Sequence, residues 1–496
     1  MAGTRWNTGD EYTVTARAMS GEGAGVCDAG GFVVFVAGLL PGERARVRLT
    51  DVRKSYARAA LLELYEASGD RTTPACAYFG DCGGCVYMHM RYDAELAHKR
   101  QVVADAFRRI AGMAGADVRP VIGAWDAGHT DCVLRYRNKG QYAYTGGGFG
   151  FYETGSRDTV TISDCLLQKD INREILQVIS YWLETKPAAS DGLNGAVIRV
   201  GEYTGDVVVI LNYSAPAHYK YLRNVLGTAG LAGVLAGRFA GVKSVVLNIR
   251  DNPAGGRRAR RPPKTMYTAV LYGDGYLHEK LGRYQFRISH DAFFQVNTVM
   301  AKRLYDVALE FARAGPNDFA LDLFCGAGAI SAYLAESAGT VVGVEMSGGA
   351  VRDARTNAAA NGIDNMAFVE GRAEHIAASF VSEYATMAGR TRDGDSAAPS
   401  AAPLANERAR PDIVTLDPPR GGCGAALLDT IKKIRPRRVV YVSCEPATLC
   451  RDAARLCSGD GAYAVAAIQP VDMFPRTASV ETAVLFVPVS ANAVKR

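Results

Sequence analysis

The chain has 496 residues, a hydrophobic fraction of 48% and a formal net charge of +6 at pH 7. This length suffices for about two to four domains with apolar cores. It contains no run of roughly eighteen apolar residues, so we expect no membrane-spanning helix. Its first residues lack the apolar core of a signal peptide, so we do not expect export. We therefore expect a cytoplasmic protein with no membrane partner, and the sequence indicates no obligate protein partner.

Three clusters of basic residues indicate a polyanionic partner. They lie at 44–58, 257–264 and 432–438. One such run is usually a solvated surface, but three in one chain favour a nucleic acid, because each phosphate contact made by Lys or Arg releases counterions. Basic charge alone does not distinguish RNA from DNA.

The first two sections of the chain differ in pattern. Residues 8–66 alternate short apolar runs with glycine-rich turns, as in EYTVTA, GEGAG and GFVVFVAG. This predicts a small β-barrel of the oligonucleotide-binding kind, although any small barrel would show the same pattern. Residues 67–290 mix helical and strand patterns and predict a central α+β section. The helix expected over 92–112 can pack on the C-terminal domain rather than beside its sequence neighbours.

From 291 to 496, strand and helix patterns alternate, which is typical of a doubly wound α/β sheet. One segment interrupts the alternation. Residues 387–411 are rich in Ala, Pro, Ser and charged residues, and we expect them to form a disordered insertion.

The strand expected at 319–324 runs into a glycine-rich turn, CGAGA, in which Gly326 and Gly328 allow close backbone approach to a ligand. Asp322 stands beside the turn, disfavours a phosphate and suits a cationic amino-acid group. Glu345 ends the next strand, 19 residues after Gly326, where a carboxylate can accept hydrogen bonds from ribose hydroxyls. These features favour S-adenosylmethionine over a dinucleotide, with a generic nucleotide-binding unit as the alternative.

The next strand ends supply candidate chemistry. Asp417 opens the segment DPPRGG, where Arg420 replaces the aromatic residue of many nitrogen methyltransferases and permits an anionic contact. Cys444 follows a strand in YVSCEPAT, in the crevice where such folds bind ligands, and its polar context makes it a candidate nucleophile. In carbon methylation of a pyrimidine, a thiolate that adds to carbon 6 activates carbon 5. Such a reaction also needs a base, and Glu481 is a candidate. The alternatives are a packed cysteine and an exposed strand glutamate.

The chain contains 11 cysteines, and in a cytoplasmic protein metal binding or catalysis is a better explanation than disulfides. Cys76, Cys82 and Cys85 lie close together in PACAYFGDCGGC. With a fourth thiolate they could hold zinc or an iron–sulfur cluster. Spacing alone decides neither the metal nor whether Cys132 or Cys165 is the fourth ligand.

Taken in order along the chain, these motifs resemble the RNA 5-methyluridine methyltransferase family. The resemblance rests on GEGAGV, PAC-x5-CGGC, FFQVN, DLFCGAG, DPPRGG, YVSCEPAT and DMFPRTASVE. It implies a multidomain fold: an N-terminal TRAM β-barrel, a central α+β section with an iron–sulfur cluster, and a C-terminal Rossmann-like methyltransferase domain. The barrel and cysteines resemble the branch that acts on 23S ribosomal RNA, which makes that RNA the expected partner, with transfer RNA as an alternative.

The resemblance also implies roles for individual residues. Cys444 matches the nucleophile and Glu481 the base that removes the carbon 5 proton. Four positions match those that bind S-adenosylmethionine: Gln295, Phe324, Glu345 and Asp417. Four cysteines match the ligands of a four-iron, four-sulfur (4Fe-4S) cluster: Cys76, Cys82, Cys85 and Cys165.

Three residues depart from the family pattern. Glu445 stands where the family usually has Asp or Asn, Arg476 where it has Gln, His or Tyr, and Ser479 where it has His. Two alternatives stay open beside a uridine enzyme, the first because its chemistry is nearly the same and the second because of these departures. One is an RNA cytidine carbon-5 methyltransferase, and the other is an RNA-binding protein with weak or lost catalysis.

Overall fold

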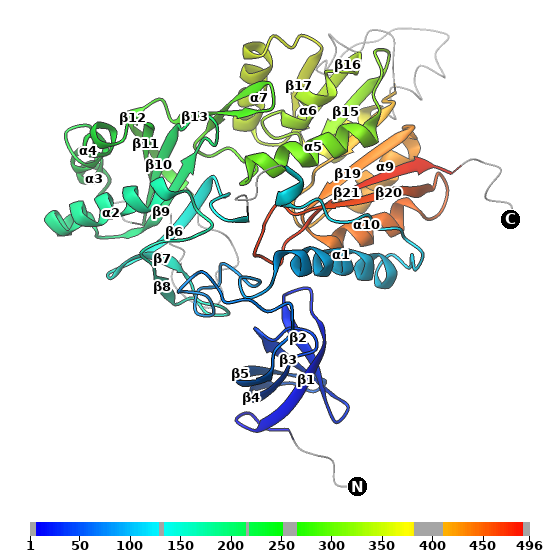
Figure 1. Ribbon diagram of the computed structural model, residues 1–496. Helices are drawn as coiled ribbons and strands as arrows, with labels where there is room; N and C mark the ends of the chain where they lie inside the picture. Colours follow the sequence, from blue (N-terminus) through cyan, green and yellow to red (C-terminus); the bar gives the residue numbers. More distant parts are fainter. Residues whose placement is uncertain (1–5, 128–132, 215–217, 251–264, 381–409, 490–496) are drawn as a thin grey trace, which may run out of the picture.

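The computed structural model describes residues 6–127, 133–214, 218–250, 265–380 and 410–489, which form three parts (Figure 1). Within these residues, no helix is long and apolar enough to cross a membrane. Three features of the sequence lie outside the described residues: the basic run at 257–264, Cys132, and the expected insertion at 387–411 except for its last two residues.

The N-terminal part is a closed five-stranded barrel with the order β1-β2-β3-β5-β4, which confirms the expected β-barrel. Its strands are β1 (Glu11–Met19), β2 (Ala24–Ala29), β3 (Phe32–Ala37), β4 (Arg44–Val52) and β5 (Tyr56–Glu66). The sequence of β4 alternates because Ala45, Val47 and Leu49 fill the barrel while the intervening arginines point outward.

The arginines of β4 do not present free positive charge. Arg46 and Arg48 both form ion pairs with Glu11 on β1, and Arg44 pairs with Glu66 on β5. Carboxylates on the neighbouring strands therefore offset much of the first basic cluster.

Helix α1 (Tyr92–Arg109) follows the barrel in the sequence and lies along α10 of the C-terminal part (Figure 1). Val103 and Phe107 are fully buried in the same apolar core as Leu449 and Leu456. Beyond α1, Val118 pairs with Ile468 on a neighbouring strand. This early segment thus completes the C-terminal domain. A short 3-10 helix (Ala124–Ala127) follows.

The central part is a seven-stranded sheet in the order β12-β11-β10-β9-β6-β7-β8. The strands are β6 (Lys139–Thr145), β7 (Gly148–Tyr152), β8 (Thr159–Thr161), β9 (Leu193–Val200), β10 (Val207–Tyr213), β11 (Val242–Arg250) and β12 (Thr265–Gly273). One face packs on α2 (Asp170–Thr185), α3 (Tyr219–Val225) and α4 (Leu231–Arg238), and a 3-10 helix (Pro187–Ala189) follows α2.

The C-terminal part is a seven-stranded sheet in the order β17-β16-β15-β18-β19-β21-β20. The strands are β15 (Phe319–Leu323), β16 (Thr340–Glu345), β17 (Met366–Glu370), β18 (Ile413–Leu416), β19 (Arg438–Ser443), β20 (Tyr463–Val471) and β21 (Glu481–Pro488). Six strands run in the same direction, while β21 runs antiparallel between β19 and β20. The strand order reverses between β15 and β18, and such folds bind ligands at that point.

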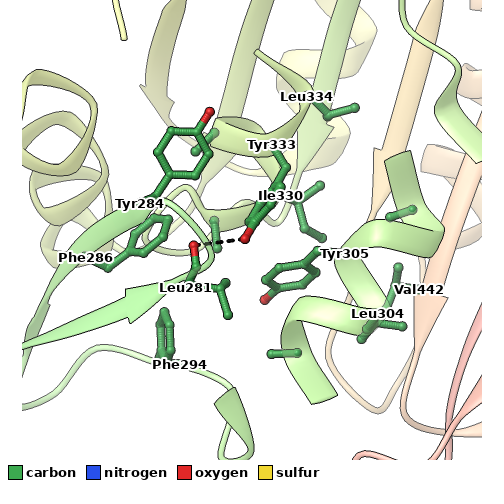
Figure 2. Close-up of a cluster of buried hydrophobic side chains, with 14 of the residues drawn as sticks. Leu281, Tyr284, Phe286, Phe294, Leu304, Tyr305, Ile330, Tyr333, Leu334 and Val442 are labelled. Carbon is green, nitrogen blue, oxygen red and sulfur yellow. Dashed lines mark hydrogen bonds between the residues drawn. The ribbon is translucent and has the colours of Figure 1, made fainter. Parts of the chain in front are cut away.

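The helices of this part are α5 (Thr298–Ala312), α6 (Ala329–Leu334), α7 (Gly348–Ala360), α9 (Ala425–Ile434) and α10 (Pro446–Leu456). A hairpin of β13 (Tyr276–Leu281) and β14 (Tyr284–Ser289) joins this part to the central sheet. Figure 2 shows Leu281 of the hairpin near Tyr305 and Tyr333, in a cluster that also holds Val442, and the Tyr333 hydroxyl donates to the Leu281 carbonyl at 2.9 Å. This shared core holds the central sheet beside the sheet of the C-terminal part.

Candidate active site

Cys444, Glu481 and Asp417 lie at one edge of the C-terminal sheet. Cys444 directly follows β19, Asp417 follows the adjacent β18, and Glu481 is the first residue of β21. Ser443 pairs with Thr482 across β19 and β21, so antiparallel pairing sets Cys444 beside Glu481. Three side chains that are distant in sequence therefore lie at one edge of the sheet, where the parallel strands β18 and β19 end and the antiparallel strand β21 begins.

Burial and neighbouring charges control the protonation of this group. Glu481 is 3% exposed, and burial together with Asp417 raises its pKa well above the usual value. Burial, followed by the charge of Glu481, raises the pKa of the Cys444 thiol to about 11. Arg420 faces both groups and lowers both pKa values. Without a ligand, the Cys444 thiol is therefore neutral near pH 7, and the Glu481 carboxyl group holds its proton more tightly than a solvent-exposed glutamate does.

Two further carboxyl groups make the edge strongly acidic. Burial, with a smaller effect from Asp322, raises the pKa of Asp417 to about 7. Burial also raises the pKa of Asp322 to about 6, although Ser331 and Thr415 donate hydrogen bonds to it at 2.5 and 2.6 Å. Such a crevice favours a cationic ligand over a phosphate.

The buried phenol of Tyr305 lies close to these carboxyl groups. Burial raises its pKa well above 10, and Asp417, Glu481 and Asp322 raise it further. Tyr305 belongs to the buried apolar face of α5. Its spacing in the sequence is that of an ordinary core residue, so the sequence did not indicate that it lies near the site.

The glycine-rich turn after β15 has the expected backbone geometry. Phe324, Gly326 and Gly328 have φ of +66°, +55° and +83°, and Phe324 adopts this left-handed conformation although it is not a glycine. Glu345 accepts hydrogen bonds from the backbone N–H of Gly326 at 3.2 Å and of Ser347 at 2.8 Å. Its carboxylate is thereby fixed beside the turn and only partly covered.

The segment FFQVN links this site to the central sheet. Gln295 is 5% exposed, and its backbone carbonyl accepts a hydrogen bond from Asn138 at 2.8 Å. Asn297 caps α5 by accepting from the Met300 N–H at 3.2 Å, and its side chain donates to the Met473 carbonyl at 3.2 Å. Asn297 therefore ties this segment to the connection that precedes Glu481.

That connection, residues 472–480, is held by a buried ion group from α1. Lys99 donates to Asp472 at 2.7 Å and to Glu95 at 2.8 Å, and all three side chains are at most 1% exposed. The Tyr92 hydroxyl also donates to Asp472, at 2.8 Å. We call Glu95, Lys99 and Asp472 the buried ion group. It fixes the start of the chain segment that ends at Glu481.

Arg476, a departure from the family pattern, has a structural explanation. Its backbone N–H donates to Glu95 at 2.7 Å, its guanidinium donates to the Met90 carbonyl at 2.7 Å, and its carbonyl accepts from the Val86 N–H at 2.9 Å. Its side chain also lies over the Tyr92 ring. Arg476 therefore fastens the cysteine-containing segment and α1 to residues 472–480.

The other two departures also keep local hydrogen bonds. Glu445 caps α10 by accepting a hydrogen bond from the Ala447 N–H at 3.4 Å, as the shorter acidic residue of the family could. The Ser479 backbone N–H donates to the Thr477 hydroxyl at 3.4 Å.

Cys76, Cys82, Cys85 and Cys165 line one cavity of about 100 Å³, which we call the cysteine cavity. Its floor is apolar, with Met88 and Leu167 packed against the thiols. Burial, and then the charges of the other three thiols, raise the pKa of Cys85 to about 12. In the part of the chain that the structure describes, no group of three or more Cys, His, Asp or Glu side chains is arranged to hold a single metal ion, and the ten cysteines there are free.

The strand order, the glycine-rich turn and the acidic strand ends define a methyltransferase fold that binds S-adenosylmethionine. Comparison with known proteins gives the family. Residues 266–488 match the model of the tRNA (uracil-5-)-methyltransferase family, and residues 5–62 match the TRAM domain. The chain belongs to this family, and it is an RNA methyltransferase of the S-adenosylmethionine-dependent uracil-5 type with RNA as its substrate.

Relatives match nearly the whole chain. An uncharacterized RNA methyltransferase of Halalkalibacterium halodurans is 35% identical, with 96% of each chain covered. Another, from Thermosynechococcus vestitus, is 34% identical and covers 97% of this chain and 98% of its own. A crystal structure of Pyrococcus abyssi tRNA (uracil-54, C5)-methyltransferase in complex with S-adenosyl-L-homocysteine has a TM-score of 0.69 at 21% identity, covering 96% of this chain and 100% of its own. This last likeness establishes the shared fold.

Proposed function

We propose that the protein methylates carbon 5 of a uridine in 23S ribosomal RNA through a covalent adduct with Cys444, and that Glu481 is the base that completes the reaction. One observation carries the proposal. The Cys444 thiol and the buried Glu481 carboxyl group stand side by side at the ends of β19 and β21, within reach of the acidic edge. Nucleophile and base must flank one uracil ring in this chemistry.

The first step belongs to Cys444. Its thiol releases a proton to solvent, and the sulfur adds to carbon 6 of the uracil. The π electrons of the carbon 5–carbon 6 bond then move toward the oxygen on carbon 4, and the resulting enolate makes carbon 5 a nucleophile. Arg420 assists, because its positive charge lowers the pKa of the thiol.

The last step belongs to Glu481. After carbon 5 has taken the methyl group, it still carries its original hydrogen. The Glu481 carboxylate removes that proton, the C–H electrons restore the carbon 5–carbon 6 double bond, and the carbon–sulfur electrons return to Cys444. Glu481 then passes the proton to solvent, and the thiolate is ready for another cycle.

Residues at the strand ends would hold the methyl donor. S-adenosylmethionine supplies, when bound, an electrophilic methyl group on a cationic sulfur. Glu345 beside the glycine turn suits its ribose hydroxyls, and Phe324 and Gln295 border the same edge. Asp417, with its pKa raised to about 7 by burial and Asp322, suits the positive charge, since a cation would stabilise its ionised form.

The cysteine cavity fits a 4Fe-4S cluster held by Cys76, Cys82, Cys85 and Cys165. Four thiols on one zinc ion would stand about 3.8 Å apart, given Zn–S bonds of about 2.3 Å. Here they surround a cavity of about 100 Å³ instead of converging on one point. A cluster there would give the protein a rigid structural element next to residues 472–480, which Val86 and Tyr87 contact just beyond Cys85.

The choice of 23S ribosomal RNA is supported by the barrel together with the cysteine cavity, which resemble the ribosomal branch of the family. Transfer RNA is the second candidate, because the family description and the Pyrococcus abyssi relative both name it.

Transfer of a labelled methyl group to unmodified 23S ribosomal RNA and to transfer RNA transcripts tests the proposal. We expect 5-methyluridine at one site in 23S ribosomal RNA, no product with Cys444→Ala, and normal activity with Cys457→Ala as the matched control. Glu481→Gln should accumulate a protein–RNA adduct that survives denaturation. A product of 5-methylcytidine would overturn uridine as the target base, and label only in transfer RNA would overturn 23S ribosomal RNA as the substrate. No transfer to either RNA would overturn the proposed activity.

The cluster has its own measurement. Protein purified without oxygen should contain about four iron and four labile sulfide per chain, and Cys165→Ser should lose both. Zinc without sulfide would refute the cluster.

A further inference from the structure

A polar groove of about 960 Å³ lies on the face of the central sheet opposite α2, α3 and α4. The hairpin β13–β14 covers part of this face, where Val208, Ile210 and Val246 join the core shared with the methyltransferase domain. The rest is uncovered and forms the groove, across β6, β7, β9 and β10. Sheets commonly leave one polar face to solvent, so the groups that line this groove decide whether it binds a ligand.

The groove is cationic. Arg137, Lys139, Arg157 and Arg250 line it, and its lining within the described residues contains no Asp or Glu. Burial, together with the charges of Arg199 and Arg250, lowers the pKa of Lys139 to about 8. Positive charges that depress one another in this way are relieved by an anionic ligand such as a phosphate.

Two buried polar atoms in the groove have no hydrogen-bond partner in the described structure. They are Oδ1 of Asn212, a side chain only 7% exposed, and Nε of Arg250. A buried polar atom without a partner costs roughly 1–3 kcal/mol, so each such atom in a native protein calls for an explanation. An acceptor and a donor that line the same cationic groove match a ligand that carries both amino or hydroxyl groups and phosphates.

An exposed aromatic ring completes the chemistry. Tyr152 is 58% exposed at the groove, whereas the ring of Tyr144 packs with the apolar core on the opposite face of the sheet. Unpaired bases stack on such rings, while bases in a duplex are not available to do so.

The groove connects two sites already described. Val296, the neighbour of Gln295, lines it, and Arg137 and Gln168 line both the groove and the cysteine cavity. A strand lying in the groove would therefore run from the cysteine cavity toward the segment that precedes α5.

We propose that this groove binds an unpaired segment of the substrate RNA away from the target uridine, with phosphates on Arg157, Lys139 and Arg250 and a base near Asn212 and Tyr152. The proposal rests on the proposed function only in taking RNA as the substrate. It gives the enzyme a second contact, by which an RNA with a single-stranded flank is preferred.

Binding of a fluorescent single-stranded RNA of twelve nucleotides without uridine tests the groove, because this probe cannot be methylated. The full-length protein, purified without oxygen, is compared with Arg157→Gln and Tyr152→Ala. Arg223→Gln is the matched control, since Arg223 is exposed on α3, which packs on the other face, and its loss changes the net charge equally.

We expect Tyr152→Ala to raise the Kd of the probe about fivefold to a hundredfold, the range of one lost stacking contact. Arg157→Gln should raise the Kd and reduce the slope of log K against log salt by about 0.7. Arg223→Gln should change neither. With 23S ribosomal RNA, the groove variants should raise KM and leave kcat at saturating RNA unchanged.

The proposal that the groove binds unpaired RNA would be overturned if the wild-type protein did not bind the probe, or if the variants and the control lost the same affinity. It would also be overturned if polyglutamate displaced the probe as effectively as RNA does, or if a duplex bound more tightly than the probe. If the protein transfers no methyl group but its probe binding is still weakened by the groove variants, the proposed function is rejected and the proposal that the groove binds RNA stands.

Discussion

Lys99→Met is expected to destabilise the methyltransferase domain strongly, because it leaves the buried Asp472 without its cation and leaves the buried Glu95 with only Arg476. The side chains of Glu95, Lys99 and Asp472 are at most 1% exposed, and the ammonium contacts the carboxylates at 2.7 and 2.8 Å. Removing one partner of such a buried pair costs roughly 3–5 kcal/mol. For a domain of this size each kcal/mol lowers the Tm by about 2–4 °C, so we expect a fall of about 6–20 °C.

The loss should depend on pH in a defined direction. Burial raises the pKa of Glu95 above its usual range, and the charge of Lys99 opposes this effect. In the variant the pKa of Glu95 rises further, so the folded protein holds the proton more tightly than the unfolded chain does. Stability from this group is then present at low pH and lost as the pH rises. Lys99→Met should therefore lose less stability at pH 5.5 than at pH 8.

Lys302→Met provides the matched control, since Lys302 pairs with Asp306 at the same helical spacing but on a partly exposed surface. Its loss should stay below about 1 kcal/mol. Calorimetry of both variants at the two pH values gives the comparison. Equal losses in the two variants, or a loss in Lys99→Met that grows toward acid pH, would show that the buried ion group does not hold residues 472–480.

Three other substitutions have defined outcomes. Arg420→Gln should slow alkylation of Cys444 by iodoacetamide at pH 8, because the charge that lowers the pKa of the thiol is gone, while Arg420→Lys keeps the rate; peptide mass spectrometry measures both. Glu445→Ala should cost roughly 0.5–2 kcal/mol of stability through loss of the α10 cap, and Glu445→Asp should not; thermal unfolding distinguishes them. Phe107→Ala should cost about 3–5 kcal/mol and lower hydrogen-exchange protection in α10, not in the barrel; equal loss in both would contradict the packing of α1.

The order of motifs predicted the methyltransferase fold, because each motif sits where a strand ends and carries its own backbone signal. The glycine turn is an example: Gly326 and Gly328 were expected to turn the chain, and both have positive φ. The neighbourhood of Cys444 and Glu481 could not be derived in this way. It depends on β21 inserting antiparallel between β19 and β20, a pairing over long sequence distance that leaves no local pattern.

Charge was the least informative property of the sequence. The arginines of β4 suggested a polyanion contact, yet Glu11, far away in sequence, forms ion pairs with two of them across the barrel. Glu95 and Lys99 have the spacing of an ordinary surface pair on a helix, but residues 472–476 cover them. In both cases the partner comes from a distant part of the chain, so the local sequence cannot reveal whether a charge is free.

The docking of α1 on the C-terminal domain has a consequence for synthesis of the chain. Tyr92 and its partner Asp472 are 380 residues apart, so at about 5–20 residues per second the apolar side of α1 waits roughly 20–80 s for its partners to leave the ribosome. Throughout that interval Val103 and Phe107 face water or a chaperone. The barrel, whose strands all lie within 11–66, can fold at once, whereas a chain shortened from its N-terminus past α1 would leave the methyltransferase core open.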